Sequence, residues 1–197
     1  MSWVLVLVIS YLLGSIPVGY WAGRMRGVDV RRYGSGNIGM TNVTRVLGPA
    51  AGLTVLLGDV AKGALAAWLG YRVGGPNLAA LAGLAAVAGH NWSLFLGGRG
   101  GRGVATSAGA ILALAPAVAV SAVGVWAVAV LSTRYVSVAS ILAGFSAPVF
   151  MLLYRQPPAY AWFGLAIAGL ILLQHRPNLR RLREGKEFRL GSGKGRR

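Results

Sequence analysis

Cysteine is absent from this chain of 197 residues, and only four residues are acidic. Without cysteine there can be no disulfide, no thiolate nucleophile and no thiolate metal ligand. With so few carboxylates, the two histidines do not make a metal site, so we expect neither a metal nor a cofactor. Charged residues make up 12% of the chain, and 20 of them are Lys or Arg. A soluble domain usually has about 25% charged residues, so the composition argues against one.

Long apolar runs account for most of the rest, because 55% of the residues are hydrophobic. Several runs approach the roughly 20 residues that a bilayer span needs. A net charge of +16 would suggest nucleic-acid binding in a soluble protein. Here the basic residues fall between the apolar runs, as the positive-inside rule predicts for membrane loops. We therefore expect an all-α, polytopic transmembrane helix bundle in a lipid bilayer, with no nucleic-acid partner.

The apolar runs predict seven helices in one transmembrane domain, residues 1–183, followed by a solvated basic cytoplasmic tail, residues 184–197. The first run lacks a basic n-region and a small-residue cleavage site, so it is interpreted as a retained helix and not a signal peptide. The expected helices cover residues 3–23, 49–70, 78–96, two short helices within 104–131, then 136–154 and 159–174.

Residues 104–131 are ambiguous, because about 42 Å of helix is too long for one ordinary span and too short for two. If this segment crosses once, Arg134 and the basic tail lie opposite the first two basic loops. If it turns back near Pro116, 17 of the 20 basic residues share one side. The positive-inside rule favours the turn, with the N-terminus outside and the C-terminus in the cytoplasm.

Residues 33–45 form a polar stretch between apolar runs, with three glycines, several Ser, Thr and Asn side chains, and Arg45. The glycines allow successive N–H groups to point into one concavity, and no carboxylate interrupts the stretch. Such a loop suits an oxyanion, above all a phosphate. The alternative is an ordinary Gly/Asn turn between two helices.

A second Gly-rich loop, residues 97–103, carries Arg99 and Arg102 and opens directly into a helix at Val104. Free N–H groups at the helix start would add to the arginines as an anion site. The alternative is a flexible loop whose arginines bind lipid headgroups. The spacing differs from that of a P-loop, so ATP hydrolysis is not expected. A third basic element, residues 175–181, should meet both loops on the cytoplasmic face.

Asp59 and Lys62 lie three residues apart in an apolar helix and can pair on one face. An unpaired charge near the bilayer centre costs roughly 3 kcal/mol, so we expect a structural ion pair, with a catalytic role as the alternative. His90 can be a hydrogen-bonded packing residue or a base. No Gly-x-Ser-x-Gly nucleophile motif is present.

Four blocks, in chain order, carry a resemblance to the bacterial acyl-phosphate:glycerol-3-phosphate acyltransferases. The first runs from Gly14-Ser15-Ile16-Pro17 through Gly34-Ser35-Gly36-Asn37-Ile38-Gly39 to Thr41, Asn42 and Arg45; the second is Gly58-Asp59 with Lys62-Gly63. The third is Gly89-His90 with residues 97–106, and the fourth is His175-Arg176 with Asn178, Arg181-Leu182 and Gly185. Arg99 and Arg102 replace the lysines usual in the Gly-rich loop of that family.

The resemblance implies a multi-pass enzyme of the bacterial cell membrane, with its active site on the cytoplasmic face. Its reaction would transfer an acyl group from acyl phosphate, and not from acyl-CoA or acyl carrier protein, to glycerol 3-phosphate, giving lysophosphatidic acid in phospholipid biosynthesis. A soluble enzyme that produces acyl phosphate is an expected partner. The implied catalytic residues are Ser35, Asn37, Arg45, His90, Arg102 and His175. The implied phosphate-binding residues are Gly34, Gly36, Gly39, Thr41, Asn42, Gly98, Arg99, Gly101, Thr106 and Asn178.

The competing functional class is a transporter or channel for an organic anion, which would also use intramembrane charge and basic Gly-rich loops. Against it, the basic loops lie on one face and no inverted repeat is evident. A non-catalytic scaffold would not explain the donor-rich loop. For the enzyme, the proton acceptor is open between a histidine and the substrate phosphate, and we favour the phosphate.

Overall fold

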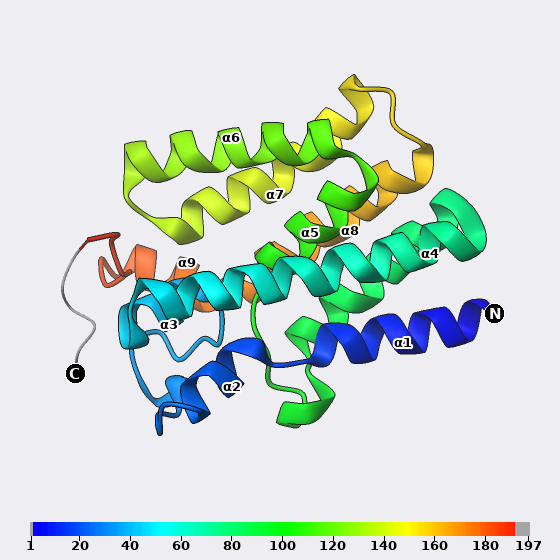
Figure 1. The fold of residues 1–197 in the computed structure, drawn as a ribbon. Coiled ribbons are helices and arrows are strands. Elements are labelled where there is room, and N and C mark those ends of the chain that lie inside the picture. Colours follow the sequence, from blue (N-terminus) through cyan, green and yellow to red (C-terminus); the bar gives the residue numbers. More distant parts are fainter. Residues whose placement is uncertain (1, 192–197) are drawn as a thin grey trace.

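The computed structural model describes residues 2–191, and every regular element in that range is helical (Figure 1). The all-helical expectation is therefore confirmed. The α-helices are α1 (Trp3–Ser15), α2 (Val18–Arg24), α3 (Met40–Leu47), α4 (Pro49–Asn91), α5 (Val104–Leu114), α6 (Pro116–Thr133), α7 (Val136–Leu153), α8 (Pro158–Gln174) and α9 (Arg176–Arg183). Two short 3₁₀ helices are η1 (Val30–Arg32) and η2 (Leu94–Leu96).

The first apolar run, expected as one helix over residues 3–23, is broken into α1 and α2. Pro17 lies at the break and has no N–H to continue the helical hydrogen-bond ladder. The preceding residue, Ile16, has the non-helical angles φ −55° and ψ 114°. Together α1 and α2 still cover 22 residues of apolar sequence, enough to cross a bilayer.

Helix α4 covers 43 residues but reverses direction at Gly74 and Gly75. Gly75 has a φ of 65°, in the left-handed region that favours glycine, and Pro76 follows it. The two arms correspond to the expected helices at 49–70 and 78–96, although the second arm ends at Asn91 and not at residue 96. Residues 94–96 form η2 instead.

The chain turns at Ala115, directly before Pro116, as the charge distribution predicted. Proline is well suited to the first position of a helix because its N–H would be unpaired there. Helix α5 is short, with 11 residues. Helix α6 has 18 residues and is long enough to cross, so the expectation that both helices would be short is wrong for the second.

By length and composition, four helical segments within residues 2–191 could cross a membrane, or five if α8 and α9, bent by 52°, form one span. The N-terminus, the α4 reversal and the α5–α6 turn lie at one end of the bundle (Figure 1). The α6–α7 turn, α3 and α9 lie at the other end. This placement is compatible with the seven-helix topology, whose helix count and orientation stay predictions.

Helix α4 contacts α1, α3, α5 and α8 and forms the centre of the bundle. At Gly63 and Gly109 the backbones of α4 and α5 approach so closely that a Cβ would collide with backbone atoms of the other helix. Such small-residue contacts are typical of membrane helices. Large apolar side chains such as Val4, Leu131 and Trp162 are exposed on the outside of the bundle, where lipid would contact them.

Candidate active site

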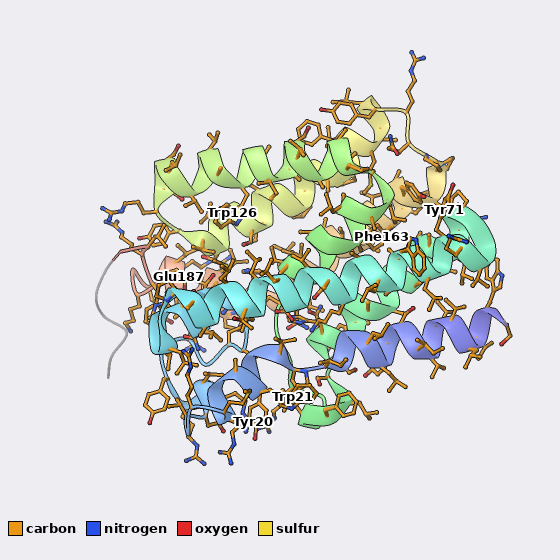
Figure 2. All side chains as sticks on the ribbon, in the orientation of Figure 1. Tyr20, Trp21, Tyr71, Trp126, Phe163 and Glu187 are labelled. Atoms are coloured by element: carbon orange, nitrogen blue, oxygen red, sulfur yellow. The ribbon has the colours of Figure 1, made fainter. Side chains whose placement is uncertain are left out.

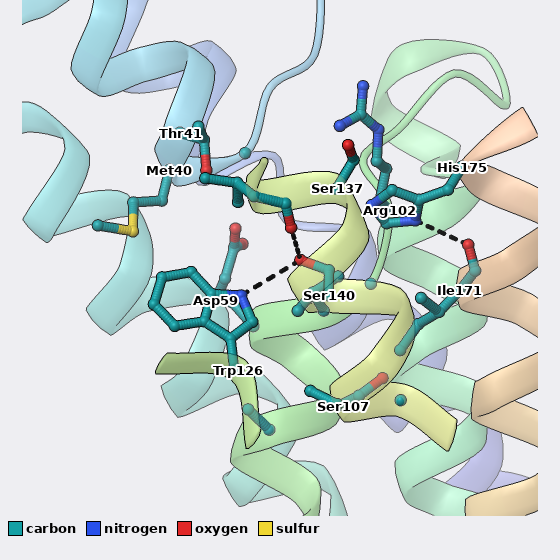
Figure 3. A pocket seen from close by; sticks show the side chains of 18 of the residues that line it. Met40, Thr41, Asp59, Arg102, Ser107, Trp126, Ser137, Ser140, Ile171 and His175 are labelled. Atoms are coloured by element: carbon teal, nitrogen blue, oxygen red, sulfur yellow. Dashed lines mark hydrogen bonds between the residues drawn. The ribbon is translucent and has the colours of Figure 1, made fainter. Parts of the chain in front are cut away.

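One elongated cavity of about 390 Å³, the main cavity, connects the α3 end of the bundle to the space between α5, α6, α7 and α8. Its first part is polar and is lined by Ser35, Asn37, Thr41, Asn42, Arg45, Asp59, His90, Arg102, His175, Asn178 and Glu187. The remainder is mostly apolar and is lined by Leu56, Ala108, Ile111, Ala119, Ala122, Val123, Trp126, Ala143, Gly144, Ala147, Ile167 and Ile171. Figure 3 shows Arg102 and His175 together near one end and Trp126 farther along.

The loop before α3 is organised by the side chain of Asn42, which is fully buried. Its amide nitrogen donates to the carbonyls of Val30 (3.1 Å), Tyr33 (3.2 Å) and Asn37 (2.9 Å). Its oxygen accepts from the N–H of Ser35 at 2.9 Å. These bonds use the Asn42 side chain to shape the loop, and its expected contact with a phosphate stays a prediction.

Gly34 and Asn37 complete this loop. Gly34 has a φ of 57°, and a Cβ at this position would collide with the Asn42 oxygen, so the conformation requires glycine. The side-chain oxygen of Asn37 accepts from the N–H of Gly39 at 2.7 Å. The loop therefore presents Ser35 and Asn37 to the main cavity on a fixed backbone.

Arg45 and Arg102 bring two guanidinium groups into the polar part of the main cavity. Burial lowers the pKa of Arg45, and the nearby Glu187 carboxylate opposes that change. Burial, together with the charge of Arg181, lowers the pKa of Arg102 to about 10. Both side chains stay positive at neutral pH, and partial burial strengthens their attraction for an anion.

Asp59, Lys62 and His90 form a buried cluster inside the bundle. The Lys62 ammonium lies 2.8 Å from Oδ1 of Asp59 and 2.8 Å from Nδ1 of His90. It also donates to the Ile16 carbonyl at 3.0 Å, at the break between α1 and α2. Asp59 and His90 reach the main cavity, whereas Lys62 does not line it. The cluster links the broken first helix to both arms of α4.

His175 lies between α8 and α9, and its Nδ1 is 2.8 Å from the Ile171 carbonyl. A carbonyl can only accept, so Nδ1 carries a proton and Nε2 offers a lone pair. Asn178, one turn further on, is buried and donates to Glu187 at 2.6 Å. Both residues line the main cavity.

The segment after α9 differs from the solvated tail expected from residue 184 onward. Glu187 accepts from Asn178 and from Arg181 (2.7 Å), and its side chain is only 5% exposed. The Phe188 ring stacks beneath the guanidinium of Arg45 at 4.6 Å. Figure 2 places Glu187 at the end of the bundle opposite Tyr71. Residues 192–197 of the expected tail lie outside the described residues.

Several expected site residues lie outside the main cavity. Thr106 is buried between helices, and Gly101 packs against the His90 ring. Arg99 and Gly36 line a separate cavity. Gly34 and Gly98 have positive φ and shape the loops without lining the main cavity.

Sequence reasoning also missed residues that line the main cavity. Gly103 follows Arg102 in the expected loop, but Glu187 and Phe188 come from the segment taken for solvated tail. Ser107 and Ser137 place buried hydroxyl groups along the cavity, and neither hydroxyl has a hydrogen-bond partner within residues 2–191. Two carboxylates within the basic stretch, Glu184 and Glu187, were the available signal for the tail, because buried arginines need a carboxylate partner.

Comparison with known proteins identifies the family. Residues 4–185 match the family model described as glycerol-3-phosphate acyltransferase. Glycerol-3-phosphate acyltransferase 2 of Moorella thermoacetica is 48% identical over 190 residues, covering 96% of this chain and 98% of the relative. Glycerol-3-phosphate acyltransferase of Desulforudis audaxviator is 47% identical and covers 94% of each chain.

Two crystal structures of PlsY, an integral membrane glycerol 3-phosphate acyltransferase, share the fold. The glycerol 3-phosphate form is 40% identical with a TM-score of 0.94, and the lysophosphatidic acid form is 39% identical with a TM-score of 0.91. Each match covers 98% of this chain and 97% of the other. The transporter and scaffold alternatives are therefore set aside. This chain is a multi-pass membrane acyltransferase and belongs to the glycerol-3-phosphate acyltransferase family.

Proposed function

We propose that this enzyme transfers an acyl group from acyl phosphate to glycerol 3-phosphate, releasing 1-acyl-glycerol 3-phosphate and phosphate. The observation that carries the proposal is the division of the main cavity into an arginine-lined polar part and an apolar part. Both substrates carry a phosphate, and the donor adds a long acyl chain. One continuous cavity with these two characters can hold the two substrates in contact.

Arg45 and Arg102 are the proposed phosphate ligands. A guanidinium presents several N–H donors in one plane and can bind two phosphate oxygens at once. Ser35 and Thr41 line the same polar part and can donate from their hydroxyl groups. Glu187 lines the same polar part, and its carboxylate is already paired with Asn178 and Arg181.

The apolar part of the main cavity is the proposed acyl groove. It lies between α5, α6, α7 and α8, and small residues on α6 and α7 leave room for a chain. Each buried methylene contributes about 0.8 kcal/mol, so a long chain anchors the donor strongly. The phosphate head of the donor would then lie among the arginines.

In the proposed step the glycerol hydroxyl oxygen attacks the acyl carbon, and a new C–O ester bond forms. The bond between that carbon and the phosphate oxygen breaks, and phosphate leaves with the electron pair. Phosphate is a good leaving group, so the protein mainly positions the reactants and neutralises charge. The hydroxyl proton passes to the phosphate monoester of the substrate, whose second pKa is near 6.

We place the reaction at the cytoplasmic face of the bacterial cell membrane, because the basic loops and the polar part of the main cavity share one end of the bundle. A soluble enzyme that makes acyl phosphate would supply the donor there. The test is turnover of radiolabelled glycerol 3-phosphate by purified protein in detergent with palmitoyl phosphate, palmitoyl-CoA or palmitoyl acyl carrier protein. We expect product with palmitoyl phosphate alone; equal rates with a thioester donor would contradict the proposal.

A further inference from the structure

A second cavity of about 330 Å³, the outer cavity, lies on the other side of the loop before α3 from the main cavity. It is lined by three arginines, Arg31, Arg32 and Arg99, together with Asp29, Gly36 and Gly100. These residues come from the segment between α2 and α3 and from the Gly-rich loop before α5. The proposed acyl transfer uses none of the three arginines.

The loop before α3 lies between the two cavities, and its successive residues line one cavity and then the other. Ser35, Asn37 and Gly39 line the main cavity, whereas Gly36 and Ile38 line the outer cavity. Gly36 has a φ of 71°, so the loop turns there, and neighbouring residues face different cavities. The Gly-rich loop is shared in the same way, because residue 100 lines the outer cavity and residues 102 and 103 line the main cavity.

The one carboxylate of the outer cavity is already neutralised by Arg31. The Nε of Arg31 donates to Oδ1 of Asp29 at 2.9 Å, and its NH2 donates to Oδ2 at 2.8 Å. Hydrogen bonding to Arg31 lowers the pKa of Asp29 to about 2, so the pair stays ionised at neutral pH. The Arg31 guanidinium also lies over the Tyr20 ring, 4.6 Å from its centroid.

Arg32 and Arg99 form no ion pair in the described part of the chain. Within residues 2–191, neither guanidinium has an ion pair, a hydrogen bond or a ring contact. Both side chains are exposed, and both line the outer cavity. Two unpaired guanidinium groups facing one concave site attract a doubly charged oxyanion.

We infer that the outer cavity is a second phosphate-binding site, in which Arg32 and Arg99 hold the phosphate group of a monoester or of a lipid headgroup. Guanidinium groups match phosphate oxygens in pairs, and the volume accommodates a phosphate with a small substituent. At the basic end of a membrane protein this chemistry has two sources, a soluble phosphate compound and an anionic lipid. The inference concerns binding and does not depend on the identity of the acyl donor.

The first arm of the test measures binding of radiolabelled orthophosphate to the protein in phosphatidylcholine nanodiscs. The variant is the double substitution Arg32→Gln with Arg99→Gln. We expect the affinity of the outer cavity for orthophosphate to fall about tenfold in this variant, because charge-assisted contacts are lost. The control is Arg24→Gln with Arg183→Gln, which removes two exposed charges outside both cavities and should bind as wild type does.

The second arm repeats the measurement in nanodiscs of equimolar phosphatidylcholine and phosphatidylglycerol, and counts the phosphatidylglycerol that stays bound after detergent extraction by native mass spectrometry. The ligand is a lipid headgroup if phosphatidylglycerol displaces orthophosphate from the sites that depend on Arg32 and Arg99. The variant should then also retain less phosphatidylglycerol than the wild type. If orthophosphate binding is unchanged by the lipid, the source is a soluble phosphate compound.

Arg102→Ala separates this inference from the proposed function. That variant should lose acyl transfer while retaining the site class that depends on Arg32 and Arg99. The inference is overturned if the Arg32/Arg99 variant and the Arg24/Arg183 control bind orthophosphate equally and also retain the same amount of phosphatidylglycerol.

Discussion

The ammonium nitrogen of Lys62 lies 2.8 Å from Nδ1 of His90. An ammonium group can only donate, so Nδ1 accepts and the ring proton of His90 belongs on Nε2. The Nε2 edge packs against Gly101, where a Cβ would collide with the ring. His90 therefore has no free lone pair for a substrate proton. Its contacts instead place the Gly-rich loop that carries Arg102.

We predict that His90→Gln retains measurable activity, because a glutamine oxygen can still accept from Lys62. The kcat/KM of wild type and variant should both rise with pH through the second ionisation of the substrate phosphate, near pH 6, since the dianion is the better base. A pH profile for both proteins checks this. Abolished turnover with intact glycerol 3-phosphate binding would identify His90 as the base.

His175 is the stronger rival, because its Nε2 lone pair is free while Nδ1 is bonded to the Ile171 carbonyl. We predict that His175→Asn also keeps measurable activity with the same pH dependence. Binding of glycerol 3-phosphate, measured by calorimetry, is the control for folding. If His175→Asn binds substrate normally and shows no turnover, His175 takes the proton and the phosphate does not.

Arg45→Ala and Arg102→Ala should each lower kcat/KM at least tenfold for one of the two substrates. The loss of one charge-assisted phosphate contact costs about 1.5–3 kcal/mol. Steady-state kinetics in detergent measure the loss, and Arg24→Ala, an exposed arginine away from the main cavity, serves as the matched control. Wild-type kinetics in either arginine variant would remove that residue from the phosphate site.

The sequence was most informative where charge and proline act locally. Placing the basic residues on one side predicted the turn before Pro116. The polar composition of residues 33–45 predicted a loop, which is correct up to Gly39, whereas the residues from Met40 onward belong to α3. The sequence could not assign Arg99 and Arg102 to different sites, because their spacing in the loop does not show which way each side chain points. The structure places them in different cavities.

Long-range packing could not be anticipated from local pattern. The sequence does not show that Asn42 shapes its loop through bonds to residues up to 12 positions away along the chain. Glu187 and Phe188 sit in a basic stretch typical of solvated tails, but the buried charge of Arg45 and Arg181 holds them over the main cavity. Such compensation becomes visible only when the helices are assembled.

The acyl groove can be shortened at Ala119, in the first turn of α6 and far from the arginine end of the bundle. We predict that Ala119→Leu lowers the ratio of palmitoyl to lauroyl transfer roughly tenfold, because overfilling a packed site costs about 1–3 kcal/mol. The neighbouring Val120 is 69% exposed on the outside, so Val120→Leu is the control. An unchanged ratio of palmitoyl to lauroyl transfer in Ala119→Leu would show that the acyl chain binds elsewhere.

Membrane orientation can be tested directly because the wild type has no cysteine. We predict that Ser2→Cys is labelled by an impermeant maleimide in whole cells, whereas Ser132→Cys and Lys186→Cys are labelled only after lysis. Ser132 lies just before the α6–α7 turn and Lys186 follows α9, at the end of the bundle opposite Ser2. Labelling of Ser132→Cys and Lys186→Cys from outside would reverse the topology.

The most direct test of the account follows both products of the reaction at once. Purified protein is given radiolabelled glycerol 3-phosphate and palmitoyl phosphate, and lysophosphatidic acid and orthophosphate are quantified over the same time course. The account predicts equal molar amounts of the two products, with both lost together in Arg102→Ala. Phosphate release without lysophosphatidic acid, or lysophosphatidic acid formed from palmitoyl-CoA at the same rate, would contradict it.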